Sequence, residues 1–185
     1  SKTYWDWLYK LGISKNLETD LFESTAGQLK SKDIFVSQPI EPAVASFGKG
    51  FSISPLKLAQ LHAVLANGGV EVVPHVTLDF KDHFKNNFQE RIFSDKVSRI
   101  VLEWMESVVD KGSGVGAKIE GYRIGGKTGT SQKAINGRYT SKKVCSFVAT
   151  FPINKPRYVV LVVIDEPSKP YAYGSTVDVP VAKEI

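Results

Sequence analysis

The residues best suited to chemistry stand together at Lys127, Thr128, Gly129 and Thr130. A lysine ammonium and two hydroxyl groups can recognise a carboxylate, because the hydroxyls donate hydrogen bonds and the ammonium supplies positive charge. On a strand at the edge of a sheet, Gly129 would let a peptide approach and pair with the backbone. We therefore predict a substrate-binding strand, with Lys127 also close to a nucleophile. The alternative is a glycine-rich turn that carries an exposed lysine.

The same lysine completes a second pattern. Residues 121–128 match the phosphate-binding loop G-x-x-x-x-G-K-T in every letter. Such a loop needs a strand before it and a helix directly after it, whose first N–H groups bind the phosphates. Residues 129–137 contain no helix start, so nucleotide binding is the weaker interpretation. Residues 112–117 fit a dinucleotide-binding fingerprint, but they follow a predicted helix and are interpreted as its glycine end and a turn.

A site that transfers an acyl group would also need a nucleophile. The chain offers only formal matches to two short serine patterns, S-x-x-K and S-x-N. Two S-x-x-K matches begin at Ser46 and Ser54, and Ser14-Lys15-Asn16 is a formal S-x-N. Ser54 precedes Pro55 and is better explained as a helix cap, since proline suits the first helical position. We predict that none of the three serines is a nucleophile.

Metal and redox chemistry have little support in the sequence. The three histidines (His62, His75 and His83) show no ligand spacing, and Cys145 is the only cysteine, so neither a metal site nor a disulfide is predicted. No cofactor is expected. Cys145 lies in an alternating apolar run and is predicted to be buried.

Helices are predicted before the candidate strand. Apolar residues at helical spacing predict helices over residues 3–11, 55–66 and 95–111, with Ser54 and Ser94 as caps and glycines after the last two. Residues 12–27 are predicted as a loop, and a second loop is expected through Pro39 and Pro42 to Phe51. Residues 70–76 are predicted as an edge strand because Pro74 interrupts them.

Strands are predicted over the last third of the chain, where the apolar period changes to two. The predicted strands are residues 121–132, 143–151 and 157–165, joined by a polar loop over 134–141 and a tight turn at 154–156. Gly174-Ser175-Thr176 is expected to cap a terminal helix. Helices followed by an antiparallel meander predict an α+β fold.

Composition indicates a globular domain without a nucleic-acid partner. The chain has 185 residues, 42% hydrophobic and 23% charged, which suits a single packed domain. The net charge of +5 comes from 24 basic and 19 acidic residues that are scattered along the chain. A scattered, mild excess is typical of a solvated surface. No segment is long and apolar enough to predict a membrane span.

Most of the chain resembles the transpeptidase domain of class B, monofunctional penicillin-binding proteins. Lys-Thr-Gly is one of the signatures of penicillin-recognising enzymes, together with S-x-x-K and S-x-N. The similar segments are residues 121–133 around the motif, 47–59, 65–69, 151–152, 158–164 and 173–177. Lys49 departs from the glutamine usual in the family's glycine loop, so no role is assigned to it.

The resemblance implies an incomplete penicillin-binding-protein or serine β-lactamase-like fold and D,D-transpeptidation of peptidoglycan stem peptides ending in D-Ala-D-Ala, with β-lactams as mimics. Lys127 would belong to the hydrogen-bond network of the active site. Thr128, Gly129 and Thr130 would bind the substrate, and the Thr130 backbone N–H would be an oxyanion donor. The serine nucleophile is expected upstream of Ser1, so the chain alone is expected to be inactive.

The resemblance also suggests how the chain fits into a longer protein. Residues 1–185 would be a partial transpeptidase domain, with the nucleophile segment, any dimerisation domain and a membrane anchor upstream. The expected location is the extracytoplasmic face of the bacterial membrane, with cell-wall or division proteins as partners. An inactive scaffold module in a cell-wall complex is the alternative. Residues 157–165 are expected to leave an apolar strand edge unpaired, which favours association.

Overall fold

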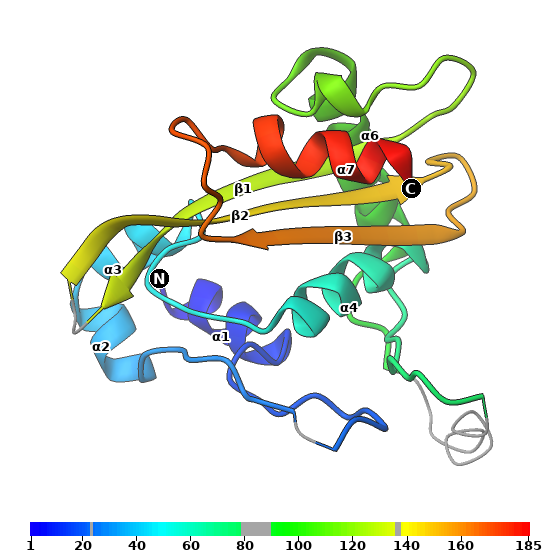
Figure 1. Cartoon of the computed structure of the whole chain (residues 1–185). Coiled ribbons are helices and arrows are strands. Elements are labelled where there is room, and N and C mark those ends of the chain that lie inside the picture. Colours follow the sequence, from blue (N-terminus) through cyan, green and yellow to red (C-terminus); the bar gives the residue numbers. More distant parts are fainter. Residues whose placement is uncertain (23, 79–89, 136–137) are drawn as a thin grey trace. The chain divides into compact units, whose positions relative to one another are not determined.

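The chain divides into two compact units (Figure 1). A computed structural model describes residues 1–22, 24–78, 90–135 and 138–185. The first unit comprises residues 1–61 and 71–92, and the second comprises residues 62–70 and 93–185. Over the described ranges, none of the helices has the length and apolar character that a membrane crossing requires.

Short helices build the first unit. They are α1 (Lys2–Lys10), α2 (Lys32–Ser37), α3 (Ile40–Ala45) and the start of α4 (Pro55–Ala66). Their apolar residues meet in one core cluster made of Leu8, Ile13, Phe35 and Ala45. The predicted helices over residues 3–11 and 55–66 are thus confirmed. The Ser54 hydroxyl accepts a hydrogen bond from the Lys57 N–H at 3.2 Å, as a helix cap does.

Two sequence predictions about this region were wrong. The loop expected through Pro39 and Pro42 contains α3, because a proline in the first helical turn loses no intrahelical hydrogen bond. The edge strand expected over residues 70–76 is absent: Val70 makes a single bridge and residues 71–75 are irregular. Pro74 has no N–H to donate, and the Val72 carbonyl accepts the Gln60 side chain at 2.7 Å instead of a strand.

An antiparallel meander forms the centre of the second unit. β1 (Gly125–Ile135), β2 (Arg138–Phe151) and β3 (Tyr158–Asp165) lie in the order β1-β2-β3. The three predicted strands and their antiparallel order are confirmed, except that the first begins at Gly125 and not at Gly121. The polar loop expected over residues 134–141 was wrong, since β1 runs to Ile135 and β2 begins at Arg138. Hydrogen bonds between Thr140 and residues 132 and 133 support this solvent-exposed extension.

Helices and turns cover the sheet within this unit. α6 (Asp95–Lys111) packs along β1 and begins at the predicted cap, since the Ser94 hydroxyl accepts from the Val97 N–H at 3.2 Å. The short turns η1 (Val115–Ala117) and η2 (Gly174–Asp178) and the helix α7 (Val179–Glu184) complete the unit, and Figure 1 shows α7 across the sheet. The main core cluster joins these elements through Val109, Ala117, Ile124, Phe147, Ala149 and Val179.

Both outer strands of the meander have one free edge. Among the described residues, β1 and β3 each pair only with β2. The motif strand β1 is therefore an edge strand of this sheet, as predicted. β3 has partly buried apolar residues, so its outer edge is the unpaired apolar edge that the sequence led us to expect.

Candidate functional site

β1 presents the four motif residues to its two faces in alternation. Lys127 and Gly129 share one face, and Thr128 and Thr130 share the other. On β2, Val148 and Ser146 lie opposite Lys127 and Gly129. Phe147 and Cys145 lie opposite Thr128 and Thr130. Lys127 and Thr130 are exposed, and the two residues between them are partly buried. The predicted site residues therefore lie together on one accessible edge strand.

Two glycines fix the strand just before the motif. A Cβ on Gly125 would lie 2.5 Å from the Ile153 side chain and 3.1 Å from Met105 of α6. A Cβ on Gly126 would lie 2.5 Å from the Phe147 ring. A side chain at either position would force its neighbours to shift, so α6 and Phe147 pack directly on the strand backbone. The position of Lys127 is set by this close packing.

The close approach of the facing strand also explains the glycine at position 129. A Cβ there would lie 2.4 Å from the Ser146 hydroxyl on the facing strand. The absent side chain thus has a structural cause in addition to the expected access for a peptide.

Each threonine hydroxyl of the motif has a partner from another segment. The Thr128 and Ser113 hydroxyls lie 2.7 Å apart, and the Gly174 N–H donates to the Thr130 hydroxyl at 3.0 Å. Ser113 lies in the glycine turn that follows α6, and Gly174 begins η2. Sequence reasoning missed both residues. Their sequences indicated only a turn and a helix start, and no local pattern shows that these segments meet β1.

Lys127 is held more loosely than the threonines. Its ammonium donates to the adjacent Thr128 carbonyl at 2.5 Å, and no carboxylate of the described residues pairs with it. The Lys127 charge acts on His62 of α4, whose Nδ1 is buried and has no hydrogen-bond partner in the described part of the chain. Burial, and to a lesser degree the Lys127 charge, lowers the pKa of His62 to about 4. The fold therefore favours a neutral imidazole within electrostatic range of Lys127.

A buried acid lies on the threonine side. Asp178 of η2 is fully buried, and neither of its carboxylate oxygens has a hydrogen-bond partner within the described ranges. Burial raises the pKa of Asp178 to about 6, although the nearby N–H groups of Ile164 and of Asp178 itself oppose the rise. Burial, followed by the Asp178 charge, also raises the pKa of Cys145, which confirms a buried thiol at this position.

The competing motif interpretations fail on geometry. Strand β1 continues from Gly125 through Thr128 to Ile135, so no helix N-terminus follows the lysine and the phosphate-binding loop is not formed. Residues 112–117 form the end of α6 and a short 3₁₀ turn, as predicted. The dinucleotide fingerprint therefore lacks the strand that it would need before it.

The formal S-x-x-K matches serve local structure. Ser54 caps α4, and the Lys57 ammonium donates to the Gln60 side chain at 2.8 Å. Ser46 ends α3 and donates its hydroxyl hydrogen to the Ala43 carbonyl at 2.7 Å. Neither serine hydroxyl contacts a basic side chain in these interactions.

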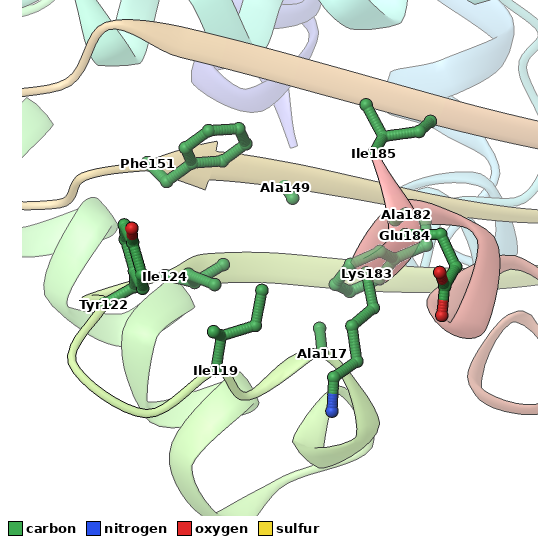
Figure 2. Close-up of a pocket in the computed structure, with 11 residues that line it drawn as sticks. Ala117, Ile119, Tyr122, Ile124, Ala149, Phe151, Ala182, Lys183, Glu184 and Ile185 are labelled. Carbon is green, nitrogen blue, oxygen red and sulfur yellow. The ribbon is translucent and has the colours of Figure 1, made fainter.

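An apolar hollow of 290 Å³ lies elsewhere on the second unit (Figure 2). Its lining includes Ile124, Ala149 and Phe151 from the sheet segment and Ala182 and Ile185 from the end of the chain. None of the four motif residues lines it. Its apolar walls offer packing, and the chemistry of the chain remains at the edge of β1.

Comparison with known proteins identifies related sequences. A sequence profile described as the penicillin binding protein transpeptidase domain matches residues 1–185. A peptidoglycan D,D-transpeptidase FtsI homolog of Mesostigma viride is 42% identical over 205 residues, which cover 98% of this chain and 34% of that protein. The probable peptidoglycan D,D-transpeptidase PenA of Neisseria flavescens is 35% identical and covers 100% of this chain and 45% of that protein.

Solved structures show the same fold. The transpeptidase domain of Burkholderia pseudomallei penicillin-binding protein 3 matches with a TM-score of 0.83 and 31% identity, over 97% of this chain and 54% of that one. Penicillin-binding protein 3 of Mycobacterium tuberculosis in complex with aztreonam matches with a TM-score of 0.81 and 25% identity, over 100% of this chain and 44% of that one. The chain thus spans between a third and about half of the length of these relatives.

Proposed function

The chain belongs to the penicillin-binding protein transpeptidase domain family, and we propose that the protein of which it is a part cross-links peptidoglycan as a serine-type D,D-transpeptidase. The edge strand β1 carries the proposal, because it displays an ammonium and two hydroxyls beside a free strand edge. These groups suit a peptide that ends in a carboxylate.

The substrate would lie along the outer edge of β1. Thr128 and Thr130 would donate to the terminal carboxylate, and Lys127 would provide positive charge beside the reacting carbonyl. Gly129 leaves room for the peptide backbone. The hydroxyls are already fixed by Ser113 and Gly174, so little freedom is lost when the ligand binds.

The Thr130 N–H is the proposed oxyanion donor. Alternate residues of an antiparallel edge strand direct their N–H groups toward and away from the partner strand. A Cβ on Gly174 would meet the Ser146 carbonyl oxygen at 2.5 Å and the Gly129 oxygen and nitrogen at 2.7 and 3.2 Å. This closeness supports a Gly129–Ser146 hydrogen-bonded pair, which leaves the N–H of Thr130 directed outward.

In the proposed reaction a serine outside the 185 residues attacks the carbonyl carbon of the penultimate D-alanine. The peptide bond breaks, the terminal D-alanine leaves with a proton on its amine, and an ester to the serine remains. An amine of a neighbouring stem peptide then attacks this ester, forms the new cross-link and releases the serine. Lys127 and Thr130 stabilise charge during both steps.

The proposal also concerns location and partners. Peptidoglycan lies outside the membrane, so the intact protein would work on the extracytoplasmic face, held by an anchor upstream. Other cell-wall or division proteins would be its partners, and β-lactams would bind as substrate mimics. The complex of the Mycobacterium tuberculosis relative with aztreonam supports this last point.

Covalent labelling with a fluorescent penicillin tests the proposal. The 185-residue chain alone is expected to remain unlabelled, and the full-length protein is expected to be labelled on an upstream serine, located by mass spectrometry. Stoichiometric acylation of Ser46 or Ser54 in the short chain would overturn the placement of the nucleophile. A full-length protein that no penicillin labels would favour an inactive scaffold module.

A further inference from the structure

The Thr130 hydroxyl accepts a hydrogen bond from a backbone amide 44 residues later in the chain. The Gly174 N–H donates to Thr130 Oγ1 at 3.0 Å. A backbone amide can only donate, so the hydroxyl oxygen must accept in this bond. The hydroxyl hydrogen of Thr130 is not used by the bond and must be directed elsewhere.

The Gly174 amide is itself fixed in place. The Tyr173 N–H donates to the Thr176 hydroxyl at 3.0 Å, and the Thr176 and Val177 N–H groups donate to the Tyr173 carbonyl at 2.8 and 3.0 Å. Gly174 is buried against the sheet, where a Cβ would lie 2.5 Å from the Ser146 carbonyl oxygen. The first turn of η2 therefore rests on the strand backbone and aims one N–H at Thr130.

Among the described residues, the Cys145 thiol is a weak acceptor for the Thr130 hydrogen. Cys145 lies opposite Thr130 in the strand register, and a hydrogen bond from Thr130 stabilises its thiolate form. The thiol is a poor acceptor in its usual protonated state. Redirecting the hydrogen from this sulfur to an anionic oxygen would cost little and would gain a charge-assisted bond.

We propose that Gly174 is a positioning residue for substrate recognition. Its amide occupies one lone pair of Thr130 and so commits the hydroxyl hydrogen to the ligand. The site then prefers a ligand end that only accepts hydrogen bonds and carries negative charge, a carboxylate, over a neutral ester or amide. This inference rests on the proposed function and extends it, since it assigns the selection of a carboxylate partly to η2.

The test must remove the N–H without adding atoms, because Gly174→Ala would place a methyl group against the Ser146 carbonyl. Replacing Gly174 by glycolate in the full-length protein turns the amide into an ester and removes only the donor. The probes are a penicillin with its free carboxylate and the methyl ester of the same penicillin. The measured quantity is the second-order rate constant of acylation, and Ser175→Ala, the next residue of η2, is the matched control.

The glycolate variant is expected to acylate about tenfold to 150-fold more slowly with the carboxylate penicillin, the worth of a hydrogen bond to a charged group. The rate with the methyl ester should change less than about twofold, since a neutral ester forms the weaker bond. In a Thr130→Val background, which lacks the hydroxyl, the glycolate replacement should have no further effect. Ser175→Ala should match the wild type with both probes.

Two results would overturn the inference in different ways. If the wild type is acylated but the glycolate replacement slows both probes equally, or still acts in the Thr130→Val background, Gly174 has only a structural role. If no penicillin acylates the wild type, the proposed function fails, and the inference fails with it.

Discussion

The two faces of β1 differ in how firmly they hold their functional groups. On one face, the hydroxyls of Thr128 and Thr130 each form a hydrogen bond with a partner from another segment. On the other face, the Lys127 ammonium donates to the carbonyl of the next residue and to no other described residue. The buried titratable groups also differ: an acid with a raised pKa lies on the threonine side, and a histidine with a lowered pKa is affected by the Lys127 charge.

Under the proposed function, this difference would separate recognition from reaction. Rigid hydroxyls suit the recognition of a fixed feature such as a terminal carboxylate, because no ordering is left to be done on binding. A mobile ammonium on a long side chain suits a group that must find its partner when the reacting groups assemble. Under the proposed function, the two hydroxyls would form the binding surface and Lys127 would act on the reacting group.

The largest expected effect comes from removing the mobile cation. Lys127→Ala in the full-length protein should slow penicillin acylation by on the order of 10²–10³, the usual loss when one charge-stabilising group is removed from an active site. Its melting temperature should stay within about 1 °C of the wild type, because the ammonium makes only a local contact. Lys142→Ala, at an exposed lysine paired with Glu166, is the control for charge and should acylate normally. If Lys127→Ala is acylated at the normal rate, the proposed division between recognition by the threonines and reaction at Lys127 is contradicted.

The next effect concerns the packing that supports both faces. Gly126→Ala should lower the free energy of unfolding by about 1–3 kcal/mol, because the new methyl group would overlap the Phe147 ring. Chemical denaturation would measure it. The double variant with Phe147→Leu should recover part of the loss by making room. A loss that is unchanged in the double variant would show that the strand, not the ring, rejects the side chain.

A smaller effect is expected on the threonine face. Asp178 has a folded pKa of about 6, above its ordinary 3.8, so the fold favours its protonated form. Stability should therefore be greatest below about pH 4 for this group and fall as pH rises through 6. Asp178→Asn should remove this decline, worth on the order of 1–2 kcal/mol at pH 7. Melting temperatures from pH 4 to 8 would measure it, with exposed Glu184→Gln as control, and an unchanged pH profile would contradict it.

The smallest effect is expected at His62 and has the opposite sign. His62 has a folded pKa of about 4, below its ordinary 6.5, so the fold favours its neutral form. The stability that depends on a neutral His62 should be fully present above pH 6.5. It should be lost as pH falls toward 4. His62→Phe should reduce the loss at pH 5 by about 1 kcal/mol. The same thermal scans apply, with exposed His75→Asn as control, and greater acid sensitivity in His62→Phe would contradict the assignment.

Local signals predicted most of the elements. Ser54-Pro55 and Ser94 mark helix starts by chemistry within one turn, alternating apolar residues mark β2, and a nearly continuous apolar run marks β3. The helices α2 and α3 escaped because each has six residues, too few for a clear period, and prolines flank or enter α3. The exposed ends of β1 and β2 escaped because they bury no face, so no apolar alternation marks them.

The motif residues of the candidate site were predictable from the sequence. The residues that hold them in place were not. Lys127 to Thr130 are adjacent in sequence, so their pattern is visible without a structure. Ser113 and Gly174 meet them only through tertiary contacts across 15 and 44 residues. Asp178 and His62 become unusual only through burial. No spacing rule in a single sequence reports which distant segments will cover a strand.

The bond between Gly174 and Thr130 also has a consequence for the timing of synthesis. The ribosome makes Thr130 44 residues before its partner amide, an interval of roughly 2–9 s at ordinary elongation rates. The β1–β2 pairing is local and can form during this interval, so the strand exists before its recognition hydroxyl is oriented. A nascent chain released before η2 has emerged would fold its hairpin yet lack an aligned carboxylate site. Under the proposed function, competence for binding would therefore be acquired late, with one of the last turns to be translated in these 185 residues.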